Sequence, residues 1–540
     1  MPHPRSNVLV IVTDQERAAG PYEPDTMAQF RVSQLPRRGQ LAREGLQFSQ
    51  HRIVSSACVP SRASMFTGQP PSVHGVRNTD GLAKRHDDPA MRWLQPMRPP
   101  TLGHYARALG METVYMGKWH LSHADLADPR GRTRMPSDST HAAYTARDVL
   151  DPYGFSGWIG PDPHGASPRN AGTARDPFYV ARAVKWLRAR ARDHERPPFV
   201  MVVSLVNPHD IVFWPGWSLW NRRNLDLAGV PMIEAATSEE HIPDREPSVL
   251  AAYREQYPRA YGPRAIVRHT YNDQRQAYRR FYCALLRRTD ALIGALADAV
   301  DETDLHETTS VVLTADHGEL LGAHGGLHQK WYNGFEEVLR VPLTIRAPGL
   351  GGGVASHALT SHLDLLPTLL GLAHPDGVQA PALQRLCDEG APTLPGHDLL
   401  GSTTRSAVFF ETQDHILEGS SRRTTFSQRF PRIGALFPMR YPPMEIRNVA
   451  VQALVAPRPR TSQSPNTPTD SATFKLIRYY APDHADFHER DEWSLFDLSR
   501  DPCELHDLHA TPNAAPVFDS LKATLAAHGL PSDPSDGAKV

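Results

Sequence analysis

The chain has 540 residues, and its 58 basic residues nearly balance its 59 acidic residues, which leaves a net charge of −1. A surface without a large field of one sign argues against a nucleic-acid-binding protein. Hydrophobic residues make up 40% of the chain and charged residues 22%, a balance that indicates a folded protein with a substantial core. The 49 prolines predict long, irregular connections over a regular scaffold.

In chain order, the first predicted elements are short apolar runs at 7–12, 113–116, 198–206 and 310–315. Continuous apolar runs of this length are typical of strands that are buried on both faces. Segments with apolar residues at helical spacing lie between or near them, at 175–193 and 275–300. This pattern predicts an α/β fold with a large mixed, mostly parallel sheet flanked by helices. Two stretches without a clear period, 121–175 and 211–270, are predicted loops around a site.

After residue 400 the pattern changes to short β-like segments at 407–412, 448–455, 474–480 and 493–498. A low-complexity stretch lies at 457–471, and a last helical segment covers 517–528. These features predict a smaller antiparallel sheet. We therefore divide the chain into an α/β domain, residues 1–400, which is expected to carry the site, and a C-terminal α+β subdomain, residues 401–540.

The four cysteines, Cys58, Cys283, Cys387 and Cys503, show no CxxC spacing. Their number and spacing predict neither a disulfide framework nor a zinc knuckle, and they favour a reducing, cytoplasmic location. The apolar run at 8–12 is too short for a secretory signal and is interpreted as the first strand. No apolar stretch approaches the roughly 20 residues that cross a bilayer, so no membrane partner is expected.

Polar side chains follow each of the four predicted strands of the large sheet. They are Asp14 and Gln15, Lys118 and His120, His209, and Asp316 and His317. Ligands of open parallel sheets bind beyond the carboxyl ends of the strands. A single polar residue there is more often a turn former, but their joint occurrence predicts a site.

Two kinds of chemistry are expected at this edge of the sheet. Asp14, Gln15, Asp316 and His317 together offer three oxygen ligands and one imidazole, which suits a divalent cation. Lys118, His120, His209 and Lys330 would add cationic or proton-donating groups. Lysine is rare in this chain, with seven residues, so a lysine in such a place is informative.

The segment SSACVPSRASMFTG, residues 55–68, holds Cys58 two residues before Pro60. Proline favours the first turn of a helix, so we expect Cys58 at a helix N-terminus, where backbone N–H groups bind an anion. A buried structural cysteine is the alternative. Three residues separate Cys58 from Arg62, whereas a tyrosine-phosphatase thiol requires five, which excludes that class.

Taken together, these motifs resemble the type I sulfatases of the alkaline phosphatase superfamily. CVPSR matches the CxPxR signature of that family, and the block at 110–120 ends in Gly-Lys-x-His like the second signature. The segments NPHD at 207–210, TADHGELLGAHGGLHQK at 314–330 and SLFDLSRDPCELHDL at 494–508 also resemble sulfatase segments. The resemblance spans most of the chain and implies an alkaline-phosphatase-like fold.

The resemblance also implies two cofactors. Cys58 would be oxidised after synthesis to formylglycine, with a formylglycine-generating enzyme as partner. One divalent metal would be bound by the residue 58 side chain with Asp14, Gln15, Asp316 and His317. Ca²⁺ is expected first, with Mn²⁺, Mg²⁺ or Zn²⁺ as alternatives.

By the same resemblance, the substrate is a small-molecule sulfate ester. Hydrated formylglycine would attack the sulfur while the metal and Arg62 hold the group. Lys118 and Lys330 would clamp the sulfate oxygens. His209, with the possible help of Lys330, would protonate the leaving group, and His120 would deprotonate the second hydroxyl of residue 58.

Alternatives follow from departures from the family pattern. Gln15 and His317 stand where many sulfatases carry Asp and Asn, and both are shared with phosphonate monoester hydrolases and with some bacterial sulfatases. Lys118 and His120 favour a sulfatase. A phosphonate monoester or phosphodiester hydrolase on the same scaffold is therefore the nearer alternative, and a non-catalytic binding protein with a relict site is the farther one.

Substrate identity and oligomeric state are not set by the sequence. The aromatic segment FWPGWSLW at 213–220 would either contact an aryl or cationic leaving group or pack a loop. Asn78 would either hydrogen-bond the sulfate or cap a turn.

Overall fold

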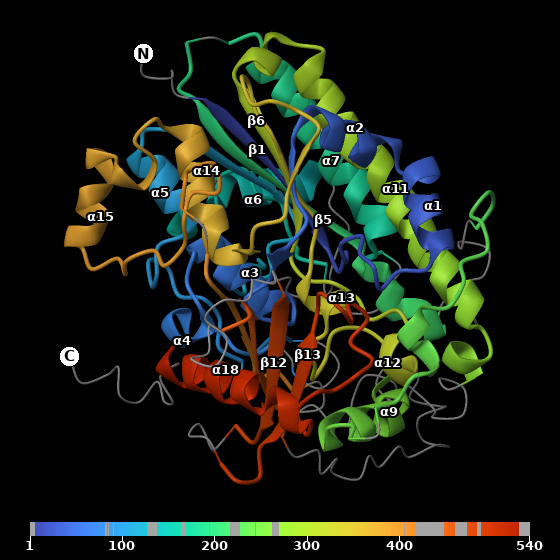
Figure 1. The fold of residues 1–540 in the computed structure, drawn as a ribbon. Helices are drawn as coiled ribbons and strands as arrows, with labels where there is room; N and C mark the ends of the chain where they lie inside the picture. Colours follow the sequence, from blue (N-terminus) through green and yellow to red (C-terminus); the bar gives the residue numbers. More distant parts are fainter. Residues whose placement is uncertain are drawn as a thin grey trace.

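The computed structural model describes residues 6–80, 84, 86–89, 91–126, 138–163, 169–193, 195–216, 227–243, 245–261, 269–403, 405–415, 448–459, 472–482 and 488–528. The described residues form three sheets: a large one in the first three quarters of the chain, a small one near its end (Figure 1), and a third of only two short strands.

The large sheet has seven strands in the order β4-β5-β1-β6-β7-β2-β8. Their bounds are β4 (Glu112–Gly117), β5 (Phe199–Pro208), β1 (Asn7–Asp14), β6 (Thr309–Ala315), β7 (Leu343–Arg346), β2 (Leu46–Phe48) and β8 (Val354–Ser356). The strands from β4 to β6 are parallel, while β7 runs antiparallel to both of its neighbours. The four predicted strands are confirmed, and the sheet is mixed and mostly parallel as expected.

Both faces of the large sheet are covered, which explains why its central strands are continuous apolar runs. On one face, Leu9 and Ile11 of β1 pack against α7 (Gly172–Arg190) and α11 (Arg275–Asp301). On the other face, Val8, Val10 and Val12 pack against α3 (Cys58–Thr67), α5 (Leu102–Ala108) and α14 (Leu365–Ala373). Figure 1 shows α7 and α11 on one side of β1 and α14 and α5 on the other.

The small sheet is antiparallel, in the order β10-β11-β12-β13. Its strands are β10 (Val408–Thr412), β11 (Ala450–Pro457), β12 (Thr473–Tyr480) and β13 (Glu492–Asp497), and α18 (Ala515–Ala527) packs on it. The predicted small antiparallel sheet is confirmed. Residues 460–471 of the predicted low-complexity stretch lie outside the described residues. The division of the chain at residue 400 stays a prediction.

Shorter elements complete the described part of the chain. They are α1 (Asp25–Gln34), α2 (Pro36–Glu44), α4 (Pro71–His74), α6 (Asp138–Arg147), α9 (Ser248–Tyr261), α12 (Ala323–Gly326), α13 (Glu336–Leu339), α15 (Gln384–Asp388), β3 (His51–Arg52) and β9 (Thr360–Ser361). None of the described helices is both long and apolar enough to span a bilayer. The stretches 121–175 and 211–270 were predicted as loops, but they contain the helices α6 and α9. This prediction was wrong.

Candidate active site

The structure brings all of the predicted site residues together at the carboxyl ends of the central strands. Asp14 is the last residue of β1, and Asp316 directly follows β6, which pairs with β1. Lys118 directly follows β4, and His209 directly follows β5, the neighbour of β1 on the other side. The roles assigned to these residues from the sequence stay predictions, but their proximity is a feature of the fold.

Cys58 is the first residue of α3, as predicted, and it is buried. Ala57, which has no polar side chain, occupies the N-cap, so the N–H groups of the first turn face the site without a side-chain acceptor from that position. The Cys58 Sγ lies 3.1 Å from His317 Nε2 and 3.5 Å from Lys330 Nζ. Burial and Asp14 raise the pKa of this thiol, but Lys118, Lys330 and His317 outweigh them and bring it well below its ordinary value.

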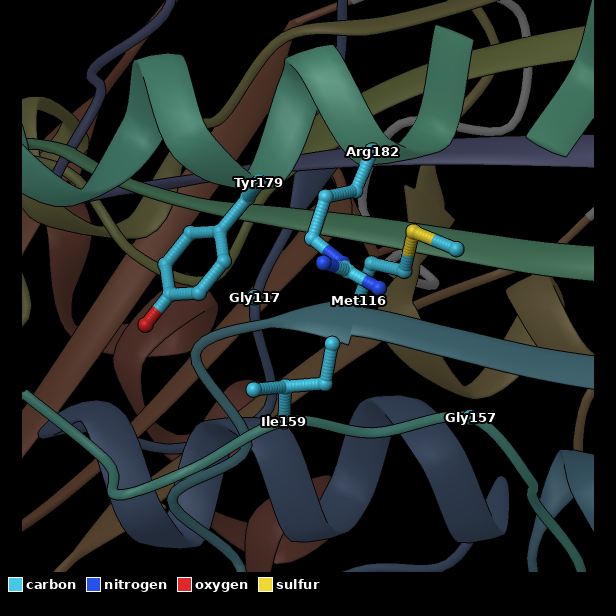
Figure 2. Close-up of a pocket in the computed structure, with 6 residues that line it drawn as sticks. All are labelled: Met116, Gly117, Gly157, Ile159, Tyr179 and Arg182. Atoms are coloured by element: carbon cyan, nitrogen blue, oxygen red, sulfur yellow. The ribbon is translucent and has the colours of Figure 1, made fainter. Parts of the chain in front are cut away.

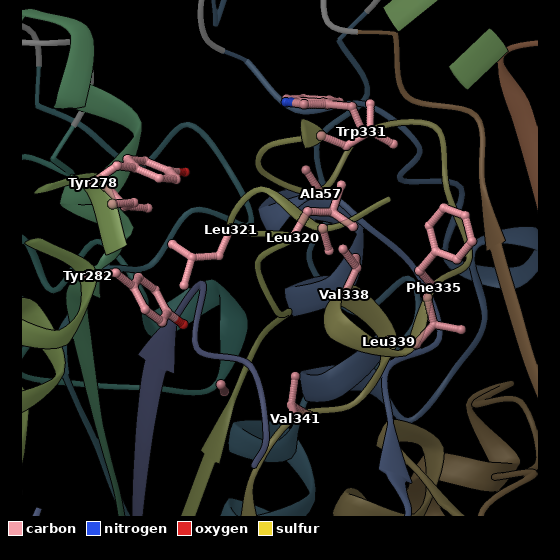
Figure 3. Close-up of a cluster of buried hydrophobic side chains, with 14 of the residues drawn as sticks. Ala57, Tyr278, Tyr282, Leu320, Leu321, Trp331, Phe335, Val338, Leu339 and Val341 are labelled. Carbon is pink, nitrogen blue, oxygen red and sulfur yellow. The ribbon is translucent and has the colours of Figure 1, made fainter. Parts of the chain in front are cut away.

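The segments that carry these residues rest on one buried apolar cluster. Ala57, next to the thiol, lies in this cluster with Leu320 and Trp331, which flank the segments of His317 and Lys330 (Figure 3). Packing of this kind fixes the backbone of the site, since a well-packed core leaves little room for displacement.

A candidate metal site lies beside the thiol. One ligand atom each from Asp14, Cys58, Asp316 and His317 lies within 4.8 Å of all the others, and all four residues are buried. His317 Nδ1 pairs with the Gly318 carbonyl oxygen at 2.9 Å, which leaves Nε2 toward Cys58. Two carboxylates and an imidazole that converge on one buried position are a suitable ligand set for a divalent cation.

Gln15 belongs to the same group through its side-chain amide. Its Nε2 donates to Glu319 Oε2 at 2.5 Å, and its Oε1 accepts from Lys330 Nζ at 2.9 Å. Glu319 therefore holds the amide so that its oxygen lies on the side of Lys330, whose ammonium also lies near Cys58 Sγ. The sequence analysis missed Glu319, although it lies only two residues after His317.

Asp14 is surrounded by cationic groups. Lys118 Nζ lies 2.5 Å from its Oδ2, and His209 Nδ1 lies 3.0 Å from its Oδ1. Burial raises the pKa of the Asp14 carboxyl, but Lys118, His209 and Arg62 outweigh it and hold the pKa well below its ordinary value. Asp14 is therefore ionised at neutral pH, as a metal ligand must be.

Arg62 is completely buried under the site. Its Nε donates to Asp316 Oδ2 at 2.9 Å, and its Nη1 donates to the Lys118 carbonyl at 3.0 Å and to Ser204 Oγ at 2.9 Å. The guanidinium thus links the ends of β4, β5 and β6. Its predicted contact with a sulfate group stays a prediction.

The turn after β4 places Lys118 and His120. Gly117 has a φ of +104°, and a Cβ at this position would lie 1.9 Å from the Ser204 carbonyl oxygen. Asp162 accepts hydrogen bonds from the backbone N–H groups of Trp119 and His120 at 2.8 and 2.9 Å. The sequence analysis missed Asp162, because nothing in its neighbourhood marks a residue that acts on a turn about 40 positions earlier.

The predicted aromatic segment and a small pocket have no defined role in the site. Trp214 from the aromatic segment is buried in the core and donates from Nε1 to the Thr270 carbonyl, which favours packing over substrate contact for this ring. Residues 217–220 lie outside the described residues. A small apolar pocket lined by Met116, Gly117, Gly157, Ile159, Tyr179 and Arg182 lies between β4 and α7 (Figure 2).

Comparison with known proteins identifies the family. A model of the sulfatase family matches residues 6–375. The chain belongs to the sulfatase family. This sulfatase-family protein is 27% identical over 398 residues to the ulvan-active sulfatase of Formosa agariphila, an alignment that covers 72% of the chain and 66% of that relative. It is 26% identical over 399 residues to the choline-sulfatase of Rhizobium meliloti, with 68% of each chain covered.

The fold is also found in solved structures. The phosphonate monoester hydrolase of Agrobacterium radiobacter superposes with a TM-score of 0.58 at 19% identity, covering 97% of this chain and 95% of that chain. A similarity at this level of identity concerns the fold, and it confirms the alkaline-phosphatase-like architecture. Family membership makes the protein an enzyme and supports sulfate ester hydrolysis as its activity.

Proposed function

We propose that the protein hydrolyses sulfate monoesters of small molecules, with formylglycine made from Cys58 as its nucleophile and one divalent cation as its cofactor. The observation that carries this proposal is the buried group around Cys58, in which carboxylates, an imidazole and two lysines meet. A formylglycine-generating enzyme is the proposed partner for maturation. A cytoplasmic location is part of the proposal and is supported by the four cysteines, none of which forms a disulfide.

The cation would be held by Asp14, Gln15, Asp316, His317 and residue 58. The oxygen ligands favour Ca²⁺ or Mg²⁺, and the imidazole favours Mn²⁺ or Zn²⁺. Ca²⁺ is proposed first because of the resemblance to the sulfatase family, with the other three ions as alternatives. When bound, such an ion neutralises charge on the sulfate oxygens and favours ionisation of a nearby hydroxyl. Hydrated formylglycine offers one hydroxyl for attack and a second from which a proton can be removed.

The remaining residues bind the substrate or move protons. Lys330, whose Nζ lies 3.5 Å from the Cys58 Sγ, and Lys118, whose Nζ lies 2.5 Å from Asp14 Oδ2, would hold the sulfate oxygens by charge. His209 has a side chain that is 20% exposed, so its ring can meet the leaving oxygen and donate a proton to it. His120 would accept a proton from residue 58.

A phosphonate monoester hydrolase is the second candidate function. Gln15 and His317 are compatible with it as well as with a sulfatase, and so is the fold similarity to the Agrobacterium enzyme. Lys118 beside Asp14 favours the sulfatase, because it completes the second sulfatase signature with His120. Parallel measurement of kcat/KM for aryl sulfates and a phenylphosphonate monoester separates the two, and a higher value for the phosphonate would replace our proposal.

The nucleophile is tested by peptide mass spectrometry of residue 58 in active protein. We expect an aldehyde in place of the thiol in a fraction of the molecules. Cys58→Ala should be inactive, and Cys58→Ser should retain little turnover because serine has no second hydroxyl to lose a proton. Full activity of Cys58→Ala would contradict the proposal, as would metal analysis of active protein that finds no stoichiometric divalent ion.

A further inference from the structure

His120 is held by a carboxylate that none of the sulfatase motifs contains. Asp80 Oδ1 lies 2.6 Å from His120 Nε2, and both side chains are only 9% exposed. The His120 ring also lies close enough to Cys58 for the two side chains to interact. Asp80 and residue 58 are therefore both neighbours of this imidazole.

The segment that carries Asp80 is fixed by the small C-terminal sheet. Asp414 lies just after β10, and its Oδ2 accepts from the backbone N–H of Thr79 at 2.8 Å. Its Oδ1 accepts from Lys84 Nζ at 2.8 Å, and Lys84 also donates to the His415 carbonyl at 2.7 Å. The side chains of Lys84 and Asp414 are 2% and 1% exposed. One buried carboxylate thus ties the chain on both sides of Asp80.

The same strand contacts the segment that leads to Cys58. Thr412 Oγ1 donates to the Ser56 carbonyl at 2.5 Å, and the Glu411 N–H donates to the Val54 carbonyl at 2.9 Å. The end of β10 therefore borders both the nucleophile segment and the segment of Asp80. A displacement of β10 would move both groups relative to the large sheet.

We propose that Asp80 is a positioning residue for His120, and that Asp414 in the C-terminal sheet sets the place of Asp80. This inference rests on the proposed function, in which the sulfated diol of residue 58 loses sulfate. The O–H bond of its free hydroxyl breaks and the proton passes to the imidazole, while the C=O bond of the aldehyde forms and the C–O bond to the sulfate breaks. Asp80 accepts the Nε2–H of His120, which presents the other ring nitrogen to residue 58. The carboxylate also stabilises the imidazolium that this transfer forms.

Kinetics of Asp80→Asn, His120→Ala and the double variant test whether Asp80 acts through His120. We expect Asp80→Asn to lower kcat at least tenfold while KM changes less than threefold, because the substrate contacts are unchanged. The double variant should be within twofold of His120→Ala. The inference would be overturned if the fold decreases in kcat of the two single variants multiplied in the double variant. It would also be overturned if the kcat of Asp80→Asn were within twofold of wild type.

The matched control is Asp273→Asn. It removes the carboxylate of another His–Asp pair, His269 with Asp273, whose side chains are 56% and 64% exposed. We expect its kcat to equal that of wild type. An equal loss in this control would mean that the effect of Asp80→Asn is not specific to His120 and would overturn the inference.

The ring of His120 gives a readout that does not depend on activity. In proteins that keep the Cys58 thiol, crystal structures or imidazole NMR signals of Asp80→Ala and Asp414→Ala should show His120 turned or mobile, because alanine at position 80 removes the acceptor of its Nε2–H. Asp414→Asn, which keeps an acceptor for the Thr79 N–H, provides a milder variant if Asp414→Ala does not fold. An unchanged ring in Asp80→Ala would overturn the inference. A wild-type protein without sulfatase activity would instead refute the proposed function, while the ring position would still test Asp80.

Discussion

Gly117 is the residue at which the backbone constraint on the site is strongest. Its positive φ and the Ser204 carbonyl 1.9 Å from any added Cβ leave no room for a side chain. We expect Gly117→Ala to lower the free energy of unfolding by about 3 kcal/mol or more and to displace Lys118. Chemical denaturation checks this, with Gly351→Ala as control, since a Cβ at Gly351 meets nothing within 4 Å.

Lys118 acts through its charge in the proposed reaction. Its ammonium is buried and contacts Asp14, so a cation lies beside the group being transferred in a site with little water. We expect Lys118→Ala to lower kcat/KM by on the order of a hundredfold or more. Lys118→Arg should recover part of the loss if the guanidinium fits. A change below threefold in Lys118→Ala would contradict the assigned role.

The site residues that could be predicted from sequence differ in kind from those that could not. Asp14, Lys118 and Asp316 were recognisable because each lies at the end of an apolar strand, in a motif. Asp80 and Asp414 act on residues 40 and 335 positions away. Such contacts arise from the packing of loops, and no local pattern of residue types indicates them.

At the scale of elements, β10 carries a buried carboxyl that makes stability depend on pH. Burial raises the pKa of Glu411 to about 7, although Arg77 and the Ser72 N–H oppose the shift. Because the folded state binds this proton more tightly than the unfolded state, the stabilisation is full below the ordinary pKa and is lost as pH rises toward 7.

Glu411→Gln removes this dependence. We expect the difference in free energy of unfolding, Glu411→Gln minus wild type, to increase between about pH 4.5 and pH 7. The increase should reach about 3 kcal/mol at the upper end of this range. Denaturation at a series of pH values measures the difference. Parallel curves for the two proteins across this range would show that Glu411 does not titrate there.

The elements themselves were predictable where one pattern dominated. The central strands are buried on both faces, so their sequences are continuous apolar runs. Helix α11 has an apolar stripe along its 27 residues. Helix α9 was missed although Val249, Leu250 and Tyr253 are buried, because it lies within a stretch rich in polar residues and proline. A few apolar residues at helical spacing did not distinguish it from a loop.

At the scale of the whole molecule, a buried charge network joins the C-terminal sheet to α13 and β3. Lys475 of β12 is fully buried and lies 3.1 Å from Glu336 of α13 and 2.5 Å from Glu504, which follows β13. Arg52 of β3 pairs with the same Glu336 at 2.7 Å. The C-terminal sheet is thus attached to earlier parts of the chain by ion pairs as well as by apolar contacts.

Removal of the Lys475 ammonium from this network should therefore lower the stability of the fold. We expect Lys475→Met to lower the free energy of unfolding by about 3 to 5 kcal/mol, since it removes the buried cation beside Glu504 and one of the cations beside Glu336. The exposed Lys185→Met is the control and should change stability by less than about 0.5 kcal/mol. Equal unfolding midpoints for the two variants would show that the network contributes nothing.

Because the chain is synthesised from its N-terminus, Cys58 is made well before the residues that bury it. Its contacts His317 and Lys330 lie 259 and 272 residues later in the chain. At about 5 to 20 residues per second, the thiol leaves the ribosome tens of seconds before the residues that bury it. An enzyme that modifies Cys58 therefore has an interval during translation in which the thiol is accessible, and that access ends when the last strands pair.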